Sequence, residues 1–334
     1  MFDVPIVLFL FRRSDTSQPI LKRISEVQPQ KIYLLCDQGR NDEEQQQVAV
    51  VRRTVEKFIT WPCEIIKYYA DENRGVYGNI ALGAKWVFER EDRAIFLEDD
   101  NLPDVSFFRY CKELLEKYQY DDRVAWICGT NYLGEYYNSN NESYMFTRNL
   151  LPCGWASWGN KFLKYYDFNF ASIHCEDDIN KIRNTYLHRS LFLQEKRSIY
   201  EEYMRKVLNQ RFRSWDFHMI YSIRANELYG ISPCVNLIKN IGVDELSEHG
   251  GNSFENEMTR RFCGIETKQL SFPLKHPSDI AIDRKYESQI ESIITRPLIM
   301  RISNRITDFL RDKLSIPAEI STKAYIKRML RGNL

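Results

Sequence analysis

The chain has 334 residues, enough for one large hydrophobic core or two modest ones. Its 47 Lys and Arg residues against 46 Asp and Glu residues leave a net charge of +1, so bulk charge attracts no nucleic acid, and no nucleic-acid partner is expected. The eight cysteines lie far apart without a C-x-x-C pair, which argues against a disulfide frame or a zinc knuckle and indicates reduced thiols of a cytoplasmic protein.

The first hundred residues predict strands and helices in alternation. Short apolar runs indicate strands at 4–11, 31–36, 63–70 and 94–97, and helical spacing indicates helices at 16–27, 41–59 and 77–89. The run 4–11 is too short to span a bilayer and lacks a basic leader, so we expect a strand and no export by that route. This alternation favours an α/β fold with a parallel sheet.

Polar residues follow each expected strand. They are Arg12 and Arg13, then Asp37 and Arg40, then Asn73, Arg74 and Gly75, then Glu98, Asp99 and Asp100. The carboxyl ends of parallel strands meet at one sheet edge, where open α/β sheets bind ligands, so this placement predicts a cleft. Taken singly, each residue also suits a turn or a helix cap. Arginines there suit a diphosphate, and an aspartate suits a ribose or a base edge.

The three carboxylates of Glu98, Asp99 and Asp100 repel one another, and keeping them ionised on a strand end requires a cation or several N–H donors. A divalent metal that carries phosphate oxygens is one such cation. The alternative is that Asp99 and Asp100 merely open a loop before a helix capped by Asp104.

The glycine-rich phosphate-binding motifs of other nucleotide-binding enzymes are missing from the sequence. It contains neither the dehydrogenase motif nor the P-loop motif, and residues 11–14 lack the glycines expected of a nucleotidyltransferase.

The second half changes character. A helix is expected at 105–118, a strand at 124–128, an aromatic loop at 132–141, a solvent-facing helical region at 177–210, a helix from 216 to about 226 and a strand at 235–238. Trp155 and Trp158 lie among small residues, which suits either pyranose stacking or burial in the core. Asp216 is well placed to be the N-cap of its helix, and His249 becomes a ligand candidate only if its glycine-flanked loop reaches the acidic strand.

The tail, residues 285–334, is basic. It contains ten Lys or Arg and five Asp or Glu. Apolar residues recur at helical spacing at Leu298, Ile302, Ile306, Phe309 and Leu310. Such a helix suits an anionic membrane surface, and packing on the main domain or in a homodimer is the alternative.

As a set, these motifs resemble glycosyltransferases of the GT-A fold, and more closely the family-2-like group identified in bacteria as hemolytic-protein-like glycosyltransferases. The matching segments are 5–13, 37–40, 73–75, 97–100, 154–158, 215–216 and 240–242. The resemblance implies a Rossmann-like, mostly parallel central sheet flanked by helices. It places a nucleotide-binding half at 1–101, an acceptor-binding half at 102–260 and a helical extension at 261–334.

The order Gly154-Trp155 and then Trp215-Asp216 also resembles the animal N-acetylglucosaminyltransferase I family, in which the aspartate is the general base. The resemblance implies Mn²⁺ or Mg²⁺ bound by Asp100, with His249 as a further ligand. Its implied donor contacts are Phe11, Arg12, Asp37, Arg40, Asn73, Arg74, Gly75, Glu98 and Asp99. Its implied acceptor or sugar contacts are Gly154, Trp155 and Trp215.

The implied activity is inverting transfer of a sugar from a nucleotide diphosphate, with UDP first, to a glycan, glycolipid or glycoprotein hydroxyl in bacterial polysaccharide or glycoprotein synthesis. The expected place is the cytoplasm, with the inner membrane face as an option for the tail. A catalytically silent carbohydrate-binding protein on the same fold is the alternative. A two-metal phosphoesterase ranks below both, since it needs more His and Asp ligands than five scattered histidines provide.

Overall fold

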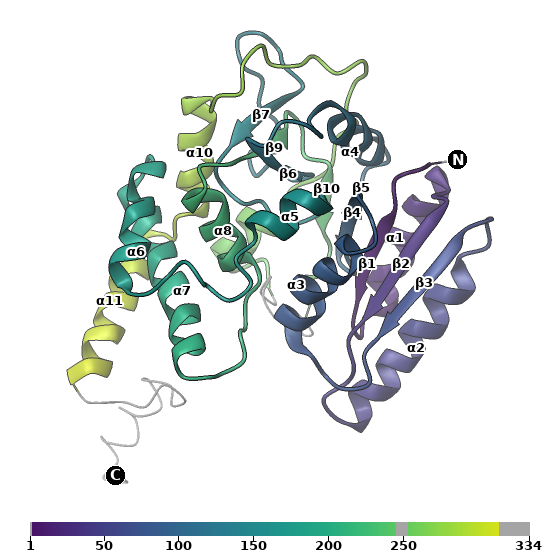
Figure 1. The fold of residues 1–334 in the computed structure, drawn as a ribbon, viewed down its shortest axis with the longest axis horizontal. Helices are drawn as coiled ribbons and strands as arrows, with labels where there is room; N and C mark the ends of the chain where they lie inside the picture. Colours follow the sequence, from purple (N-terminus) through teal and green to yellow (C-terminus); the bar gives the residue numbers. More distant parts are fainter. Residues whose placement is uncertain (1, 245–252, 314–334) are drawn as a thin grey trace. The chain divides into compact units, whose positions relative to one another are not determined.

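The computed structural model describes residues 2–244 and 253–313, and Figure 1 shows its helices flanking a central sheet. It divides into two compact units, Met1–Ile293 and Ile294–Leu334. The first unit therefore extends beyond residue 260, where the sequence suggested a boundary. No helix of the described residues has both the length and the apolar content that crossing a membrane requires.

Eight strands form one sheet in the order β3-β2-β1-β4-β8-β6-β9-β7. In chain order they are β1 (Ile6–Leu10), β2 (Lys31–Cys36), β3 (Glu64–Tyr69), β4 (Arg93–Glu98), β6 (Val124–Cys128), β7 (Tyr144–Thr147), β8 (Trp155–Trp158) and β9 (Tyr229–Pro233). Two short strands, β5 (Asn101–Pro103) and β10 (Ile238–Asn240), form a separate antiparallel pair.

The strand directions confirm the expected α/β class with a mostly parallel central sheet. β1 is parallel to β2 and β4, β2 is parallel to β3, and β6 is parallel to β9. β8 runs antiparallel between β4 and β6, and β7 is antiparallel to β9. All five residues of β1 are buried, as expected for a strand covered on both faces.

Helices of the first unit alternate with strands as far as β6 and after that mostly follow one another. They are α1 (Ser14–Val27), α2 (Asp42–Phe58), α3 (Gly75–Phe88), α4 (Ser106–Lys117), α5 (Gly159–Tyr165), α6 (Glu176–Asn180), the 3₁₀ helix η1 (Lys181–Thr185), α7 (Arg189–Val207), α8 (Asp216–Ala225), α9 (Glu257–Cys263) and α10 (Arg284–Ile294). The second unit contains α11 (Leu298–Lys313). Local signals explain their ends: Asn41 caps α2 by accepting a hydrogen bond from Glu44 N, and acidic residues fill its first turn.

An aromatic stack crosses the middle of the sheet and forms its core. The Phe9 and Phe96 rings lie 5.8 Å apart on β1 and β4, and Trp155 of β8 stacks between Phe96 and Trp126 of β6 at 3.9 and 4.1 Å. These side chains come from four adjacent strands, so the stack fixes strands from both halves of the chain against one another.

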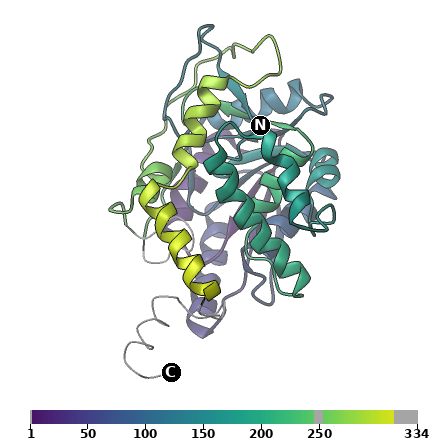
Figure 2. The same cartoon turned by 90° about the vertical axis from the view of Figure 1, so that its left-hand side faces the viewer.

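The region 177–210, which was expected to face solvent, is partly buried. In α7, Glu195 and Glu202 are each 5% exposed. The segment before α7 contacts α10, where Leu187 N donates to Glu291 Oε1 over 3.0 Å, and Figure 2 views this side of the unit. The charged residues of this region suggested exposure to solvent, but the carboxylates of Glu195 and Glu202 are buried and form their hydrogen bonds with protein groups instead of water.

The end of the first unit also differs from the sequence expectation. The strand expected at 235–238 is replaced by β9, which ends at Pro233, and β10, which begins at Ile238. In the second unit, α11 has exposed apolar side chains, with Leu298 61% and Ile299 83% exposed. The expected membrane or dimer contact of this helix stays a prediction.

Candidate functional site

The acidic motif lies where the sequence places it, at the carboxyl edge of the sheet. β4 ends at Glu98, whose Cα is paired in register with Phe9 on the neighbouring strand β1. One residue further, Asp99 Oδ2 accepts a hydrogen bond from Phe11 N over 3.1 Å. The three carboxylates and the polar residues that follow β1 therefore face the same edge of the sheet.

Burial raises the pKa of every carboxylate in the motif, and repulsion by neighbouring carboxylates adds to this effect at Glu98 and Asp99. The pKa of Glu98 is well above its usual value because of desolvation and then the charges of Asp100, Asp99 and Asp216. Desolvation and the Asp100 charge raise the pKa of Asp99 to about 7, against the opposing effect of Arg13. Asp216 is far away in the sequence, but its negative charge is close enough to contribute to the raised pKa of Glu98.

Asp100 is held by contacts of both its side chain and its backbone. Its Oδ1 accepts a hydrogen bond from Asn101 Nδ2 over 2.6 Å, and its backbone oxygen accepts one from Ile241 N over 2.8 Å. Arg13 Nη1 lies 3.4 Å from Asp100 Oδ2. Desolvation raises the pKa of Asp100, and Arg13 partly offsets that effect.

Arg13 connects the motif to the segment after β10. Its side chain is only 8% exposed, and its Nη2 donates to Gly242 O over 3.3 Å and to Asp244 Oδ1 over 2.9 Å. Gly242 lies so close to the pair that an added Cβ would sit 2.3 Å from Asp100 Oδ2 and 2.4 Å from Arg13 Nη1. Only glycine fits there without moving one of the charged groups.

Asp37 organises the loop that follows β3. Its Oδ1 accepts hydrogen bonds from Gln38 N and Arg74 N over 2.8 and 2.7 Å, and its Oδ2 accepts from Gly75 N and Asn73 Nδ2 over 3.0 and 3.1 Å. Two acceptor positions on each oxygen are thereby filled. Asp37, which is 5% exposed, holds the loop and has no lone pair left for the ribose or base expected from the sequence.

Two arginines converge on the carboxylate of Glu44 beside the end of β1. Arg12 Nη1 and Arg40 Nη2 lie 2.7 and 2.6 Å from Glu44 Oε1. Both guanidinium groups lie over the Phe11 ring, 5.5 and 5.6 Å from its centroid. Hydrogen bonding by Arg40 and the charges of Arg40 and Arg12 hold the pKa of Glu44 at about 2, so this carboxylate is ionised at neutral pH.

Arg74 adds a third arginine to this edge, and it stacks 4.2 Å above the Tyr68 ring. Arg211, which the sequence did not single out, donates from Nη1 to Asn73 O over 3.3 Å. Tyr68 stacks in turn on Trp86, 4.4 Å away. Aromatic faces therefore orient the arginines expected to meet a diphosphate.

Asp216 is the first residue of α8, and the N-cap is Trp215, which forms no side-chain cap. The N-cap alternative for Asp216 is therefore wrong. Ser214 Oγ donates a hydrogen bond to Asp216 Oδ1, and none of the described residues donates one to Oδ2. Asp216 also contributes to the raised pKa values of Tyr132 and Tyr166, which places it among half-buried and buried phenols beside the motif.

Trp155 and Trp215 differ from the expected sugar contacts. They are 1% and 5% exposed, and their rings stack 5.9 Å apart in the aromatic core, so neither offers a face to a pyranose. Gly154 has a positive φ of 61° and donates from N to Asn101 Oδ1 over 2.8 Å. Its role in this structure is to hold the residue next to Asp100.

The three adjacent carboxylates suit a hard divalent cation, because carboxylate oxygens are the ligands that Mg²⁺ and Mn²⁺ prefer. A cation would also offset the repulsion from Asp100 that, after desolvation, raises the pKa of Glu98 and Asp99. Across residues 2–244 and 253–313, no three His, Cys, Asp or Glu side chains form a complete metal-ligand group. A cation there would take its remaining ligands from water or phosphate oxygens. His249 lies outside the described residues.

Several residues near the motif were not predicted as site residues. Burial and the charges of Asp100 and Glu98 raise the pKa of the Cys153 thiol, whose Sγ lies 3.9 Å from Asn240 Nδ2. Arg13 was noted only as a possible diphosphate contact. The signals available were the match at 240–242 and the arginine pair at 12–13, but neither indicates which side chains meet.

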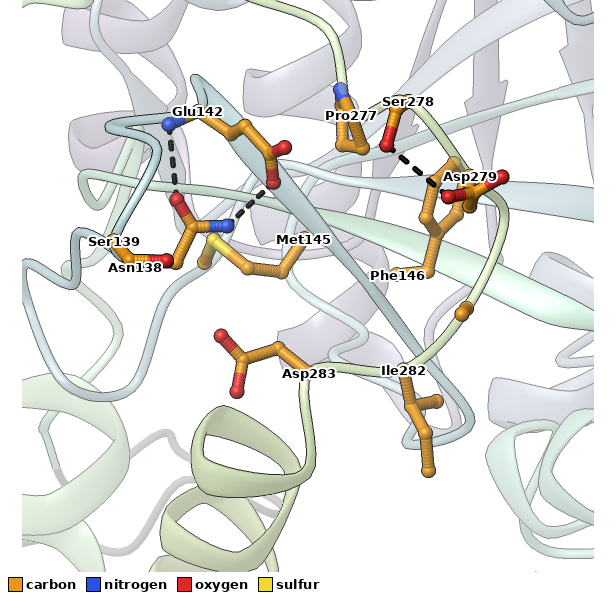
Figure 3. A pocket seen from close by; sticks show the side chains of 11 residues that line it. Asn138, Ser139, Glu142, Met145, Phe146, Pro277, Ser278, Asp279, Ile282 and Asp283 are labelled. Carbon is orange, nitrogen blue, oxygen red and sulfur yellow. Dashed lines mark hydrogen bonds between the residues drawn. The ribbon is translucent and has the colours of Figure 1, made fainter.

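A separate cavity of about 240 Å³ lies between the loop around Asn138 and the segment before α10 (Figure 3). Asn138 Oδ1 accepts a hydrogen bond from Glu142 N over 3.1 Å, and Asp283 lies at the opposite wall. None of its lining residues belongs to the acidic motif or to the loops after β1 to β3. This cavity is therefore not part of the strand-end site.

The chain matches no protein-family model, and no curated protein matches it in sequence. Among solved structures, a UDP-glucose pyrophosphorylase in complex with UDP-glucose is 10% identical with a TM-score of 0.36, over 72% of this chain and 94% of that chain. HddC from Yersinia pseudotuberculosis in complex with GMP-PN is 12% identical with a TM-score of 0.27, over 42% and 66%.

The 4-diphosphocytidyl-2C-methyl-D-erythritol synthase from Anaerococcus prevotii is 11% identical with a TM-score of 0.31, over 67% of this chain and 84% of that chain. At these identities and TM-scores the likeness concerns the arrangement of the fold and assigns no activity to this chain. The function is therefore argued from its own residues.

Proposed function

We propose that this chain is a metal-dependent inverting glycosyltransferase that moves a sugar from a nucleotide diphosphate, with UDP as the first candidate, to a hydroxyl of a glycan, glycolipid or glycoprotein. One arrangement carries the proposal. Asp216 follows Trp215, whose ring stacks 5.9 Å from that of Trp155 on the strand beside β4. The charge of Asp216 acts on the desolvated Glu98 carboxylate at the end of β4. A cation-binding group and a candidate base are the two parts that such a transfer needs.

The positive side chains beside the motif suit the diphosphate. Arg12 and Arg40 both pair with Glu44 beside the end of β1, and Arg74 is oriented by the ring of Tyr68. Guanidinium groups bind phosphate oxygens through paired N–H donors. These arginines, with the loop that Asp37 holds, would bind the donor and stabilise the negative charge that grows on the leaving diphosphate.

Asp100 is the residue assigned to hold the divalent ion, and Glu98 and Asp99 are assigned to the donor side. The ion, when bound, supplies Lewis-acid stabilisation of the leaving group. Asp216 Oδ2 accepts the proton of the acceptor hydroxyl as that oxygen forms a bond to the anomeric carbon. The bond from this carbon to the diphosphate oxygen breaks, its electron pair leaves with the diphosphate, and the anomeric configuration inverts.

A silent carbohydrate-binding protein on the same fold is the competing function. The burial of Trp155 and Trp158 counts against it, because these were the indoles considered for stacking on a pyranose. A two-metal phosphoesterase is disfavoured, since the described residues contain no group of three possible metal ligands. Slow hydrolysis of a nucleotide sugar in the presence of Mn²⁺ separates the proposal from a silent carbohydrate- or nucleotide-sugar-binding protein, because a protein that only binds the donor does not cleave it.

A thermal-shift panel tests the proposal. UDP, GDP, CDP and dTDP are each added with and without Mn²⁺, and a matching diphosphate should raise the stability by about 2.7 kcal/mol at 100 times its dissociation constant. Asp100→Asn should lose the Mn²⁺-dependent part of the shift, and the surface variant Asp122→Asn should keep it. The proposal fails if no diphosphate gives a Mn²⁺-dependent shift, or if Asp100→Asn responds like the unchanged protein.

A further inference from the structure

We propose that Arg13 is the internal counter-cation of the acidic motif, and that a divalent cation bound at Asp100 moves its guanidinium away from Asp100 and so shifts the backbone at Gly242 that lies against it. This inference rests on the proposed function, because it assumes the cation site at Asp100. It goes beyond that function by assigning Arg13 a positioning role that couples occupancy of the site to a neighbouring segment.

The first step is that Arg13 stands among more negative charge than it can compensate. Its guanidinium lies 3.4 Å from Asp100 Oδ2 and 2.9 Å from Asp244 Oδ1, and Asp99 also feels its charge. The Arg13 side chain is 8% exposed, so water screens these interactions little. One cation among several carboxylates leaves the site negative and receptive to a divalent cation.

The second step is that the contact between Arg13 and Asp100 is the weaker one. Charge-assisted N–H···O hydrogen bonds are typically about 2.7–2.9 Å long, and the 3.4 Å separation from Asp100 exceeds that, whereas the contact with Asp244 does not. A cation that ligates Asp100 Oδ2 adds repulsion to the guanidinium at the same oxygen. The Arg13 side chain then has to move away from Asp100.

The third step is that Arg13 cannot move without disturbing the segment that lies on it. Its Nη2 donates to Gly242 O over 3.3 Å, and a Cβ on Gly242 would lie 2.4 Å from Nη1, so this backbone lies directly against the guanidinium. Ile241 N remains bonded to Asp100 O over 2.8 Å, which keeps the start of the segment in place. The change is therefore expected after Ile241 and first at Gly242, whose backbone lies against the guanidinium.

The first measurement needs no variant. Amide hydrogen exchange of 242–244 in the full chain is compared with and without Mn²⁺ alone, and we expect Mn²⁺ to accelerate exchange there and not at the backbone of Ile241. Unchanged or slower exchange at 242–244 under saturating Mn²⁺ overturns the inference, since the displaced guanidinium would have left the segment in place.

The second measurement is Mn²⁺ affinity by electron paramagnetic resonance, without nucleotide. A nearby opposite charge changes a carboxylate's affinity for a cation by a factor of about ten or more, which corresponds to about one pKa unit. Arg13→Gln should therefore bind Mn²⁺ at least about tenfold more tightly than the unchanged protein. A purely structural Arg13 would give weaker binding on substitution, which overturns the inference. Arg13→Lys keeps a cation that cannot reach all three partners and should give an intermediate affinity. Arg109→Gln, an exposed arginine paired with Glu113, is the matched control and should change nothing.

The two failures are distinguishable. Absence of Mn²⁺ binding to the unchanged protein and to Arg13→Gln overturns the metal site and the inference with it. Equal Mn²⁺ affinity in the unchanged protein, Arg13→Gln and Arg13→Lys, with binding lost in Asp100→Asn, overturns the role of Arg13 and leaves the proposed metal site standing.

Discussion

The indole of Trp155 stacks on the ring of Phe96 with their centroids 3.9 Å apart and their planes 12° from parallel. The two residues are paired in register across β8 and β4, so one antiparallel strand is attached to the strand that delivers the acidic motif. The stack therefore joins the two halves of the chain directly below the candidate site.

Truncating the Trp155 indole should lower the stability of the protein without removing a side chain that contacts a ligand. Trp155→Ala removes a side chain that is 1% exposed, and such a change typically costs about 3–5 kcal/mol of unfolding free energy. Trp155→Phe keeps one aromatic ring in the stack and should cost less. Urea unfolding measures both. Tyr120→Ala, at a position 92% exposed, is the control, and an equally small loss for Trp155→Ala would contradict a core role.

Asp37→Asn should loosen the loop that carries Asn73, Arg74 and Gly75. The amide has only one acceptor oxygen, so its NH₂ group would face backbone N–H groups that now donate hydrogen bonds to the Asp37 carboxylate. Leaving such buried donors unpaired should lower the free energy of unfolding by roughly 1–3 kcal/mol. Chemical unfolding gives the stability change, and a thermal-shift titration gives the weakened binding of the diphosphate. The exposed neighbour Asp71 provides the control Asp71→Asn, and normal stability and affinity for Asp37→Asn would refute this assignment.

Sequence patterns predicted the first half of the fold because the signals there are local. The apolar runs gave the strands Lys31–Cys36 and Val124–Cys128 with the observed bounds, and parallel pairing then brought the strand-end residues to one edge. The short strands Tyr144–Thr147 and Trp155–Trp158 were missed, since four residues carry little periodicity and tertiary register sets their pairing.

The contacts of individual site residues were beyond the reach of local patterns. Arg13 and Gly242 are 229 positions apart, and no motif spacing connects them. The tryptophans show the same limit, because an indole among small residues suits a binding surface and a core equally well. Neighbouring strands, which the sequence does not reveal, place Trp155 between Phe96 and Trp126.

A buried histidine should make stability depend on pH. His218 is fully buried, stacks on Phe170 at 3.8 Å and hydrogen-bonds through Nδ1 to Asp167 O over 2.8 Å, and desolvation lowers its pKa from 6.5 to about 4. The unfolded chain therefore binds more protons between these values, so the free energy of unfolding falls as pH drops through 6.5 towards 4. The loss is roughly 3 kcal/mol.

Urea unfolding at several pH values isolates this contribution as the difference between the unchanged protein and His218→Gln. The variant should be less stable near pH 7, and the gap should narrow as the pH approaches 4. His174→Gln, at an exposed position, should follow the unchanged protein throughout. A gap that stays constant between pH 7 and 4 would falsify the neutral, buried state of His218.

Asp216→Asn should separate binding from chemistry. The amide keeps the shape of the side chain and the contact with Ser214 but cannot take a proton, so we expect turnover to fall by a factor of about 100 to 10,000. Because the acceptor is not identified, the readout is slow hydrolysis of a nucleotide-sugar panel with Mn²⁺, in which water takes the place of the acceptor. The Mn²⁺-dependent thermal shift with the nucleoside diphosphate should persist, since Asp216 is assigned to the acceptor side.

The matched control for this variant is Glu227→Gln, whose side chain is 77% exposed and which lies just beyond the same helix α8. It should hydrolyse the donor at the normal rate. Near-normal turnover by Asp216→Asn would remove this residue from the mechanism, because an amide cannot replace a general base. Loss of both the thermal shift and turnover would instead give Asp216 a role in donor binding, and the base would then have to come from another carboxylate of the site.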